Sequence, residues 1–159
     1  MSGGPGTAMG ISVTLVTADQ QAPLGFIHTV PASVSPTGLG PNDWIYIQAD
    51  PAGADLQPGE IISTGSGPGV VAKAAIALTP AACIGVAQHE IAAGYWGFIL
   101  KSGLGNTIDD GSYGTLAGAG IVCGGGGNAT EAAALTDAVI GVALAAPGVG
   151  VLALSRILL

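Results

Sequence analysis

Two cysteines and two histidines are the side chains of this sequence best suited to nucleophilic or metal chemistry. A thiol beside an imidazole makes an activated nucleophile, and cysteine and histidine at short spacings bind zinc. His28, His89, Cys83 and Cys123 stand in none of these spacings. We therefore expect no catalytic residue, no metal site and no cofactor. Both cysteines lie in apolar, strand-like stretches and are predicted to be buried free thiols.

A glycine run and a polar tripeptide are the next candidates for a site. The run "GGGGNAT", residues 124–130, does not have the Lys-Ser or Lys-Thr that closes a phosphate-binding loop, so we interpret it as a flexible turn. The tripeptide Gln88-His89-Glu90 follows a β-like run and is predicted to be a polar turn.

One stretch resembles an enzyme motif. "KSGLGNTIDDGSYGTL", residues 101–116, resembles the Ser-Gly-Leu-Gly and Ile-Asp-x-x-Tyr motifs of the trimeric dUTP pyrophosphatases. That resemblance implies that Asp109 orients a water molecule and that Tyr113 stacks on the base. Here the two motifs are nearly fused, Lys101 replaces the usual arginine, and the glycine-rich C-terminal tail is missing. A turn at the paired aspartates is the favoured interpretation, and the enzyme is the minor alternative.

The composition excludes several classes of protein. The chain of 159 residues has 49% hydrophobic and 8% charged residues, with 28 glycines. Three basic against ten acidic residues give a net charge of −7, so we expect no nucleic-acid binding, which needs clustered cations. The uncharged run 138–154 is 17 residues long and contains Pro147, so no membrane span is expected. The N-terminal residues show no secretory signal, which predicts synthesis in a cytoplasm.

An internal repeat organises the chain. "ACIGVAQHEIAAGYWGFIL" (82–100) returns as "AVIGVALAAPGVGVLALSR" (138–156), offset by 56 positions. Upstream, 58–73 matches 110–125, which places Val71 opposite Ile121 or Val122. The repeat units are 58–103 and 110–156. One β-hairpin unit cannot bury its apolar face alone, so we expect the two units to pack together.

The fold is predicted to be all-β, a small β-barrel or β-sandwich built from two similar β-hairpin units with an extended N-terminal arm. Alternating apolar and polar residues predict strands over 11–17 and 43–50. Closely spaced prolines from Pro23 to Pro41 favour an extended path, so we divide the chain into an arm, 1–42, and a β-rich domain, 43–159. The Ala-rich links 72–78 and 129–135 are left open between strand and one helical turn.

A wider resemblance covers residues 55–156. Pro-Gly-Glu-Ile-Ile (58–62), Gly-Val-Val-Ala-Lys (69–73), Ile-Gly-Val-Ala (84–87) and the closing strand 94–100 together resemble the capsid cement, or head decoration, proteins of tailed bacteriophages. The resemblance implies a non-enzymatic virion protein, usually a homotrimer, on the outer surface of the capsid. It also implies that the major capsid protein is the partner, whose lattice it stabilises. A tail or other β-structured virion component is the alternative class.

Apolar residues of the arm and the two tryptophans are the predicted partner-contact residues, because large apolar side chains dominate binding energy at interfaces. Ordinary core packing is the competing interpretation for both tryptophans. The predicted contact residues are Leu24, Phe26, Ile27, Val30, Trp44 and Trp96.

Overall fold

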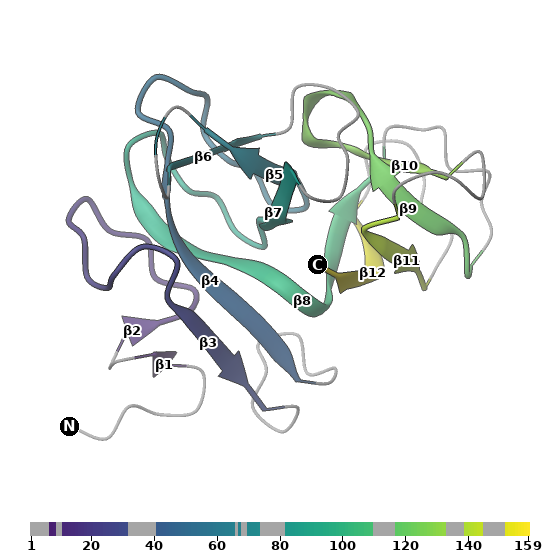
Figure 1. Ribbon diagram of the computed structural model, residues 1–159, viewed down its shortest axis with the longest axis horizontal. Helices are drawn as coiled ribbons and strands as arrows, with labels where there is room; N and C mark the ends of the chain where they lie inside the picture. Colours follow the sequence, from purple (N-terminus) through teal and green to yellow (C-terminus); the bar gives the residue numbers. More distant parts are fainter. Residues whose placement is uncertain are drawn as a thin grey trace.

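The computed structural model describes residues 7–8, 11–31, 41–65, 67, 70–73, 82–109, 117–132, 139–144 and 152–159 (Figure 1). These residues form strands and one 3-10 turn, η2 (Gly125–Gly127), and none of them is in an α-helix, which confirms the predicted all-β class. The strands are β1 (Thr7–Ala8), β2 (Ile11–Ser12), β3 (Ile27–Val30), β4 (Asn42–Ala49), β5 (Ile61–Thr64), β6 (Val70–Lys73), β7 (Cys83–Val86), β8 (Trp96–Ile108), β9 (Gly120–Cys123), β10 (Ala129–Glu131), β11 (Gly141–Ala143) and β12 (Leu152–Leu158).

Five strands close into a small barrel, which is one of the two architectures that the sequence predicts. β4 pairs with β6 in parallel, and the ring continues through antiparallel pairs from β6 to β5, β7, β8 and back to β4. Ile47, Ile62, Val71 and Ile99 come from four of these strands and pack in one buried cluster, with Ile84 of β7 against it. Side chains alternate across a strand, so this cluster is the inward face of the ring.

The remaining strands repeat the topology of the barrel. β5 pairs with β6 and β7, and β7 pairs with β8; likewise β9 pairs with β10 and β11, and β11 pairs with β12. The second set lies to one side of the barrel (Figure 1). An isolated parallel bridge from Asp109, at the end of β8, to Ala129 in β10 matches the parallel pairing of Ala49 in β4 with Val71 in β6. The second unit therefore repeats the strand order of the barrel as β8, β12, β11, β9 and β10, with a single bridge between its two end strands.

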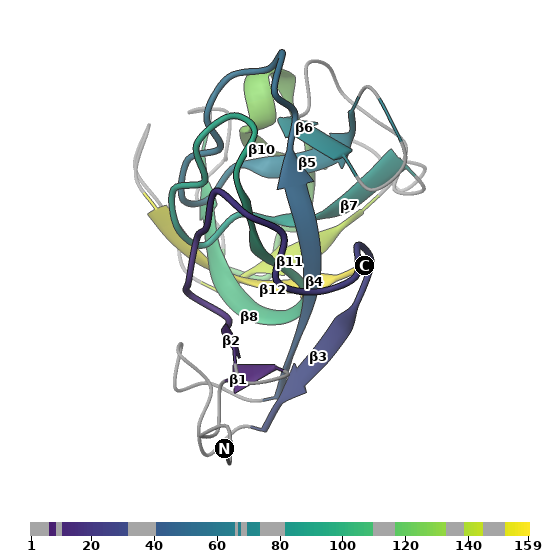
Figure 2. The same ribbon diagram turned by 90° about the vertical axis from the view of Figure 1, so that its left-hand side faces the viewer.

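The long strand β8 belongs to both units. It pairs with β4 over Trp96–Ser102 and with β12 over Ser102–Ile108, so the two ladders meet at Ser102. Figure 2 shows the pronounced curve of β8 between its two partners. In the ladders, Ile47 pairs with Gly97 and Thr107 with Ala153. Residues 97 and 153 differ by 56, the repeat offset, so the β8–β12 ladder is the counterpart of the β4–β8 ladder.

The ladders correct part of the sequence alignment. The match of Val71 with Ile121 or Val122 would make β6 the counterpart of β9. Instead Ile62 faces Gly85 while Ile121 faces Gly141, so β5 is the counterpart of β9. The mismatch arose because glycine-rich turns resemble one another in sequence without sharing a place in the sheet. The structural unit also extends back to β4, ahead of the start of the sequence match.

The repeated Ile-Gly-Val-Ala phrase has a packing reason in the first unit. A side chain at Gly85 would have its Cβ 2.6 Å from the carbonyl oxygen of Leu100 and 3.0 Å from the Ile99 side chain. Only glycine allows β7 to lie this close to β8. Val86 and Ala87, which follow Gly85, are both buried. Ala87 belongs to the cluster inside the barrel, and Val86 belongs to a second cluster outside it.

A second core joins the two units. Val86 and Leu100 of the barrel pack in one cluster with Ile121, Ile140 and Ile157 of the second unit. Because the barrel interior is a separate cluster, this core lies between the barrel's outer face and the second set of strands. Residues of both copies of the repeated phrase, Val86 and Ile140, lie in this core, so the two units bury apolar side chains against each other as the sequence predicts.

The N-terminal segment 11–31 lies along the barrel of its own chain. The strand expected over 11–17 is wrong beyond Ser12, because the Ser12 hydroxyl lies 2.9 Å from the Thr14 hydroxyl and the chain turns there. Further on, the Gln21 amide donates to the Tyr46 hydroxyl (2.9 Å), and β3 pairs with β4. The arm's described part therefore uses β4 as its support. The division of the chain at residue 42 stays a prediction.

Both turn predictions that lie in described residues are confirmed. The glycine run joins β9 to β10, with the Gly124 amide donating to the Asn128 carbonyl at 2.8 Å. Gln88 and His89 form a bend after β7. The Ala-rich links begin within β6 and β10, and their later residues, 74–78 and 133–135, lie outside the described residues.

Candidate interaction surface

Asp43 ties three strands together where the two ladders of β8 meet. Its register partners are Thr29 in β3 and Ser102 in β8. The Thr29 hydroxyl donates to Oδ1 at 2.6 Å, and the Ser102 hydroxyl donates to Oδ2 at 2.9 Å. These two hydrogen bonds, helped by the charge of Lys101, lower the pKa of the Asp43 carboxyl, so it is ionised at neutral pH.

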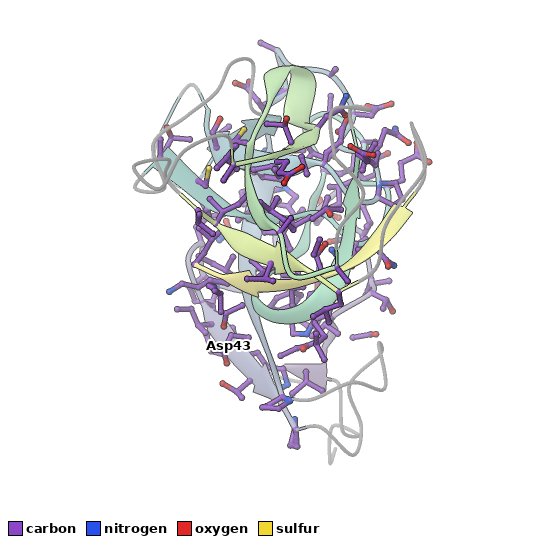
Figure 3. The ribbon with its side chains drawn as sticks, turned by 90° about the vertical axis from the view of Figure 1, so that its right-hand side faces the viewer. Asp43 is labelled. Carbon is purple, nitrogen blue, oxygen red and sulfur yellow. The ribbon has the colours of Figure 1, made fainter. Side chains whose placement is uncertain are left out.

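A hollow of about 440 Å³ opens beside this carboxylate, which Figure 3 labels. We call it the Asp43 hollow. Its lining residues are Thr29, Pro41, Asp43, Ser102, Gly103, Ile157, Leu158 and Leu159. Among these described lining residues Asp43 is the only one with a charged side chain, so this part of the hollow is electronegative, and the Thr29 and Ser102 hydroxyls lie beside the carboxylate.

A second depression, of about 390 Å³, lies beside the end of β12. We call it the apolar groove. Its lining residues are Ile45, Cys83, Ile84, Lys101, Val139, Leu158 and Leu159. Leu158 and Leu159 line both depressions, so the Asp43 hollow and the apolar groove adjoin along the end of β12.

Large apolar side chains around the groove are open to solvent. Leu158 is 55% exposed and Val139 41%. Ile27, also exposed, is the cross-strand partner of the groove residue Ile45. Clustered exposed apolar side chains beside a concave surface are typical of a protein interaction site.

The predicted contact residues divide between core and surface. Val30 and Trp44 are 0% and 1% exposed, in the core. Phe26 and Trp96 are half-buried and pack against the same core, where the Trp96 ring stacks on Tyr46 with centroids 6.4 Å apart. Leu24 is half-buried, and Ile27 is exposed beside the groove. That these residues contact a partner stays a prediction.

Sequence reasoning missed the groove residues themselves. Ile84 and Val139 stand in the repeated phrase and Leu158 lies beyond the repeat, so the residue pattern marks none of them as exposed. A usable signal was the strand-ending "ILL", whose consecutive leucines cannot both face one core.

The side chains that could act as nucleophiles or metal ligands lie mostly in the interior. Cys83 and Cys123 are buried and free, as predicted. A hydrogen bond between them and burial raise the pKa of the Cys83 thiol, which makes it a poor nucleophile. Burial lowers the pKa of His89. Within the described residues, no three His, Cys, Asp or Glu side chains gather in a way that could hold a metal ion.

The dUTP pyrophosphatase motif is not assembled as a solvent-facing site. Asp109 is 2% exposed, and its backbone forms the isolated bridge to Ala129. A carboxylate that orients a water molecule needs access to solvent and substrate. Tyr113 lies outside the described residues.

No helix among the described residues is long and apolar enough to cross a membrane.

Comparison with known proteins identifies a fold. No protein-family model matches the chain, and no curated protein matches it. In structure the chain is similar to the head fiber gp8.5 N base of bacteriophage phi29, with a TM-score of 0.55 and 16% sequence identity. The match covers 72% of this chain and 92% of that chain. The likeness at this identity is one of fold.

Proposed function

We propose that this chain is a non-enzymatic structural protein of a bacteriophage virion, attached to the head. The observation that carries the proposal is the similarity of fold to a phage head-fiber base, of which the structural match covers 92%. The resemblance of residues 55–156 to capsid cement proteins supports the same class from the sequence.

Within that class, the role is that of a decoration protein on the outer capsid surface, bound to the major capsid protein and assembled as a homotrimer. A net charge of −7 disfavours contact with packaged DNA, which suits the outer surface. A protein that binds only the assembled lattice stabilises that lattice by mass action. The exposed apolar side chains around Leu158 support a role in binding.

A second candidate role is the base of a fiber on the head. The fold similarity to a head-fiber base favours it. Both roles place the chain on the outside of the head and require a surface that contacts the capsid. They differ in whether the bound protein stabilises the shell.

Binding to heads tests the proposal. Purified protein is mixed with undecorated heads of the encoding virus and sedimented, and bound copies are counted per capsid subunit. We expect saturable binding, and a raised temperature of head disruption if the protein acts as cement. Saturable binding without that rise favours the fiber base, whereas no binding contradicts attachment to the head. Light scattering tests the trimer, since a monomer at micromolar concentration contradicts it.

A further inference from the structure

Two depressions of opposite character share one wall at the end of β12. The Asp43 hollow holds an ionised carboxylate, and the apolar groove presents Ile84 and Val139. Leu158 lines both and is the most exposed large apolar side chain among the described residues. One ligand segment laid across Leu158 would therefore meet a negative charge on one side and an apolar floor on the other.

The carboxylate of Asp43 retains capacity for another donor. A carboxylate has about four acceptor sites, and the Thr29 and Ser102 hydroxyls use one on each oxygen. These hydrogen bonds also fix the orientation of the carboxylate. A fixed carboxylate at the wall of a hollow suits a guanidinium or ammonium group.

The charge balance of the chain indicates where that cation comes from. The chain has three basic and ten acidic residues. Among the residues whose side chains the structure describes, Lys101 is the one cation that lines either depression, and it lies in the apolar groove. A second copy would bring a further net charge of −7, so a basic segment of a different protein is the better complement.

We propose that the Asp43 hollow and the apolar groove together bind one segment of a partner protein in which an Arg or Lys stands beside apolar residues. The basic group lies against Asp43, and the apolar side chains lie in the groove against Val139 and Leu158. The inference rests on the proposed function, because the partner is taken to be the outer surface of the capsid. It names the surface of this chain that makes the contact.

Matched variants test the proposal in the head-binding assay. Asp43→Asn removes the charge, and Leu158→Ser and Val139→Ser remove exposed apolar groups. Asp19→Asn and Leu144→Ser are the controls, since both residues are exposed and neither lines a depression. Thermal unfolding of each variant shows that it is folded before binding is measured.

We expect Asp43→Asn to weaken binding about tenfold and Leu158→Ser by about ten- to hundredfold, while the controls bind as the unmodified chain does. Equal binding by all folded variants overturns the inference and leaves head attachment standing. Failure of the unmodified chain to bind overturns the proposed function and the inference with it.

The occupant is identified by cross-linking. A photo-reactive phenylalanine analogue replaces Leu158, and the bound complex is irradiated and digested. We expect adducts with a capsid-protein peptide that has Arg or Lys within a few residues of the linked position. Adducts with another copy of this chain assign the surface to self-association and overturn the inference, as do adducts with a capsid peptide free of basic residues.

Discussion

The hydroxyl oxygens of Thr107 in β8 and Ser155 in β12 lie 2.9 Å apart, and both residues are 0% exposed. The β8–β12 ladder is the counterpart of the β4–β8 ladder, so Thr107 corresponds to Ile47 of the barrel and Ser155 corresponds to Ile99. The repeat has thus replaced an apolar contact by a buried hydrogen bond in its second unit.

This exchange predicts strong coupling between the two hydroxyl residues. Thr107→Val removes this hydrogen bond from the Ser155 hydroxyl, and each single substitution costs about 0.5–1.5 kcal/mol of unfolding free energy. The double variant Thr107→Val, Ser155→Ala removes both groups and costs less than the sum of the singles. Urea unfolding of the four proteins measures the coupling, and strict additivity would show that the hydrogen bond contributes nothing.

The junction at Ser102 predicts an unusually costly glycine substitution. Gly103 has φ +116°, and a Cβ there would collide with Asn42 Oδ1 and lie 2.8 Å from the Pro41 carbonyl oxygen. Asn42 Oδ1 also accepts from the Leu104 amide at 2.9 Å, so it cannot shift freely. The control is Gly118, which has φ +96° and open space around it.

Gly118→Ala should cost about 1–2 kcal/mol for its backbone conformation alone. Gly103→Ala should cost about 1–3 kcal/mol more, because overlap is added to strain. Thermal unfolding of both variants measures the difference, and equal losses would mean that the chain relaxes around Asn42 without penalty.

The sequence predicts the all-β class of the fold, but it does not show which strands pair to close the barrel. Glycine turns and alternating runs predict strands, and the Ile-Gly-Val-Ala phrase reveals the repeat. The sequence does not reveal that β8 belongs to both units. The second half of β8 is the counterpart of β4, but it has Thr107 at the position where β4 has Ile47, so the two segments do not look alike. Where a strand has apolar residues on both faces, the sequence alone also cannot show which face points into the barrel.

The location of the candidate surface was harder to predict from the sequence than the class of fold. Val30 and Trp44 are apolar, as contact residues are, but the pairing of β3 with β4 places both in the core. The lining of the Asp43 hollow and the apolar groove comes mainly from five strands, β3, β4, β7, β8 and β12, that are spread along the sequence. Only the ladders bring Thr29, Asp43 and Leu158 together.

His89 predicts a loss of stability in mild acid. Its pKa in the folded protein is lower than the ordinary value of 6.5, because burial disfavours the charged ring. The unfolded chain therefore binds the proton first, and stability falls as the pH drops below 6.5, levelling off below the folded-state pKa. Melting temperatures between pH 8 and 5 should show this slope for the unmodified chain and for His28→Gln, and a smaller slope for His89→Gln. An unchanged slope in His89→Gln would exclude this source.

Asp43 predicts a second loss at lower pH. Its folded-state pKa is below the ordinary value of 3.8, so its contribution is present above pH 3.8 and is lost as the pH falls through the folded-state pKa. Asp43→Asn should remove that part of the acid decline, whereas Asp19→Asn should keep it. Melting curves between pH 5 and 2.5 make the comparison, and identical declines in both variants would contradict the role given to the Thr29 and Ser102 hydrogen bonds.

The most direct test of head attachment is a cryo-electron microscopy difference map between heads of the encoding virus with and without this chain. The account predicts density on the outer surface of the shell into which the five-stranded barrel and its second unit fit, with the end of β12 toward the capsid protein. Heads without such density, or density confined to the tail, would contradict it.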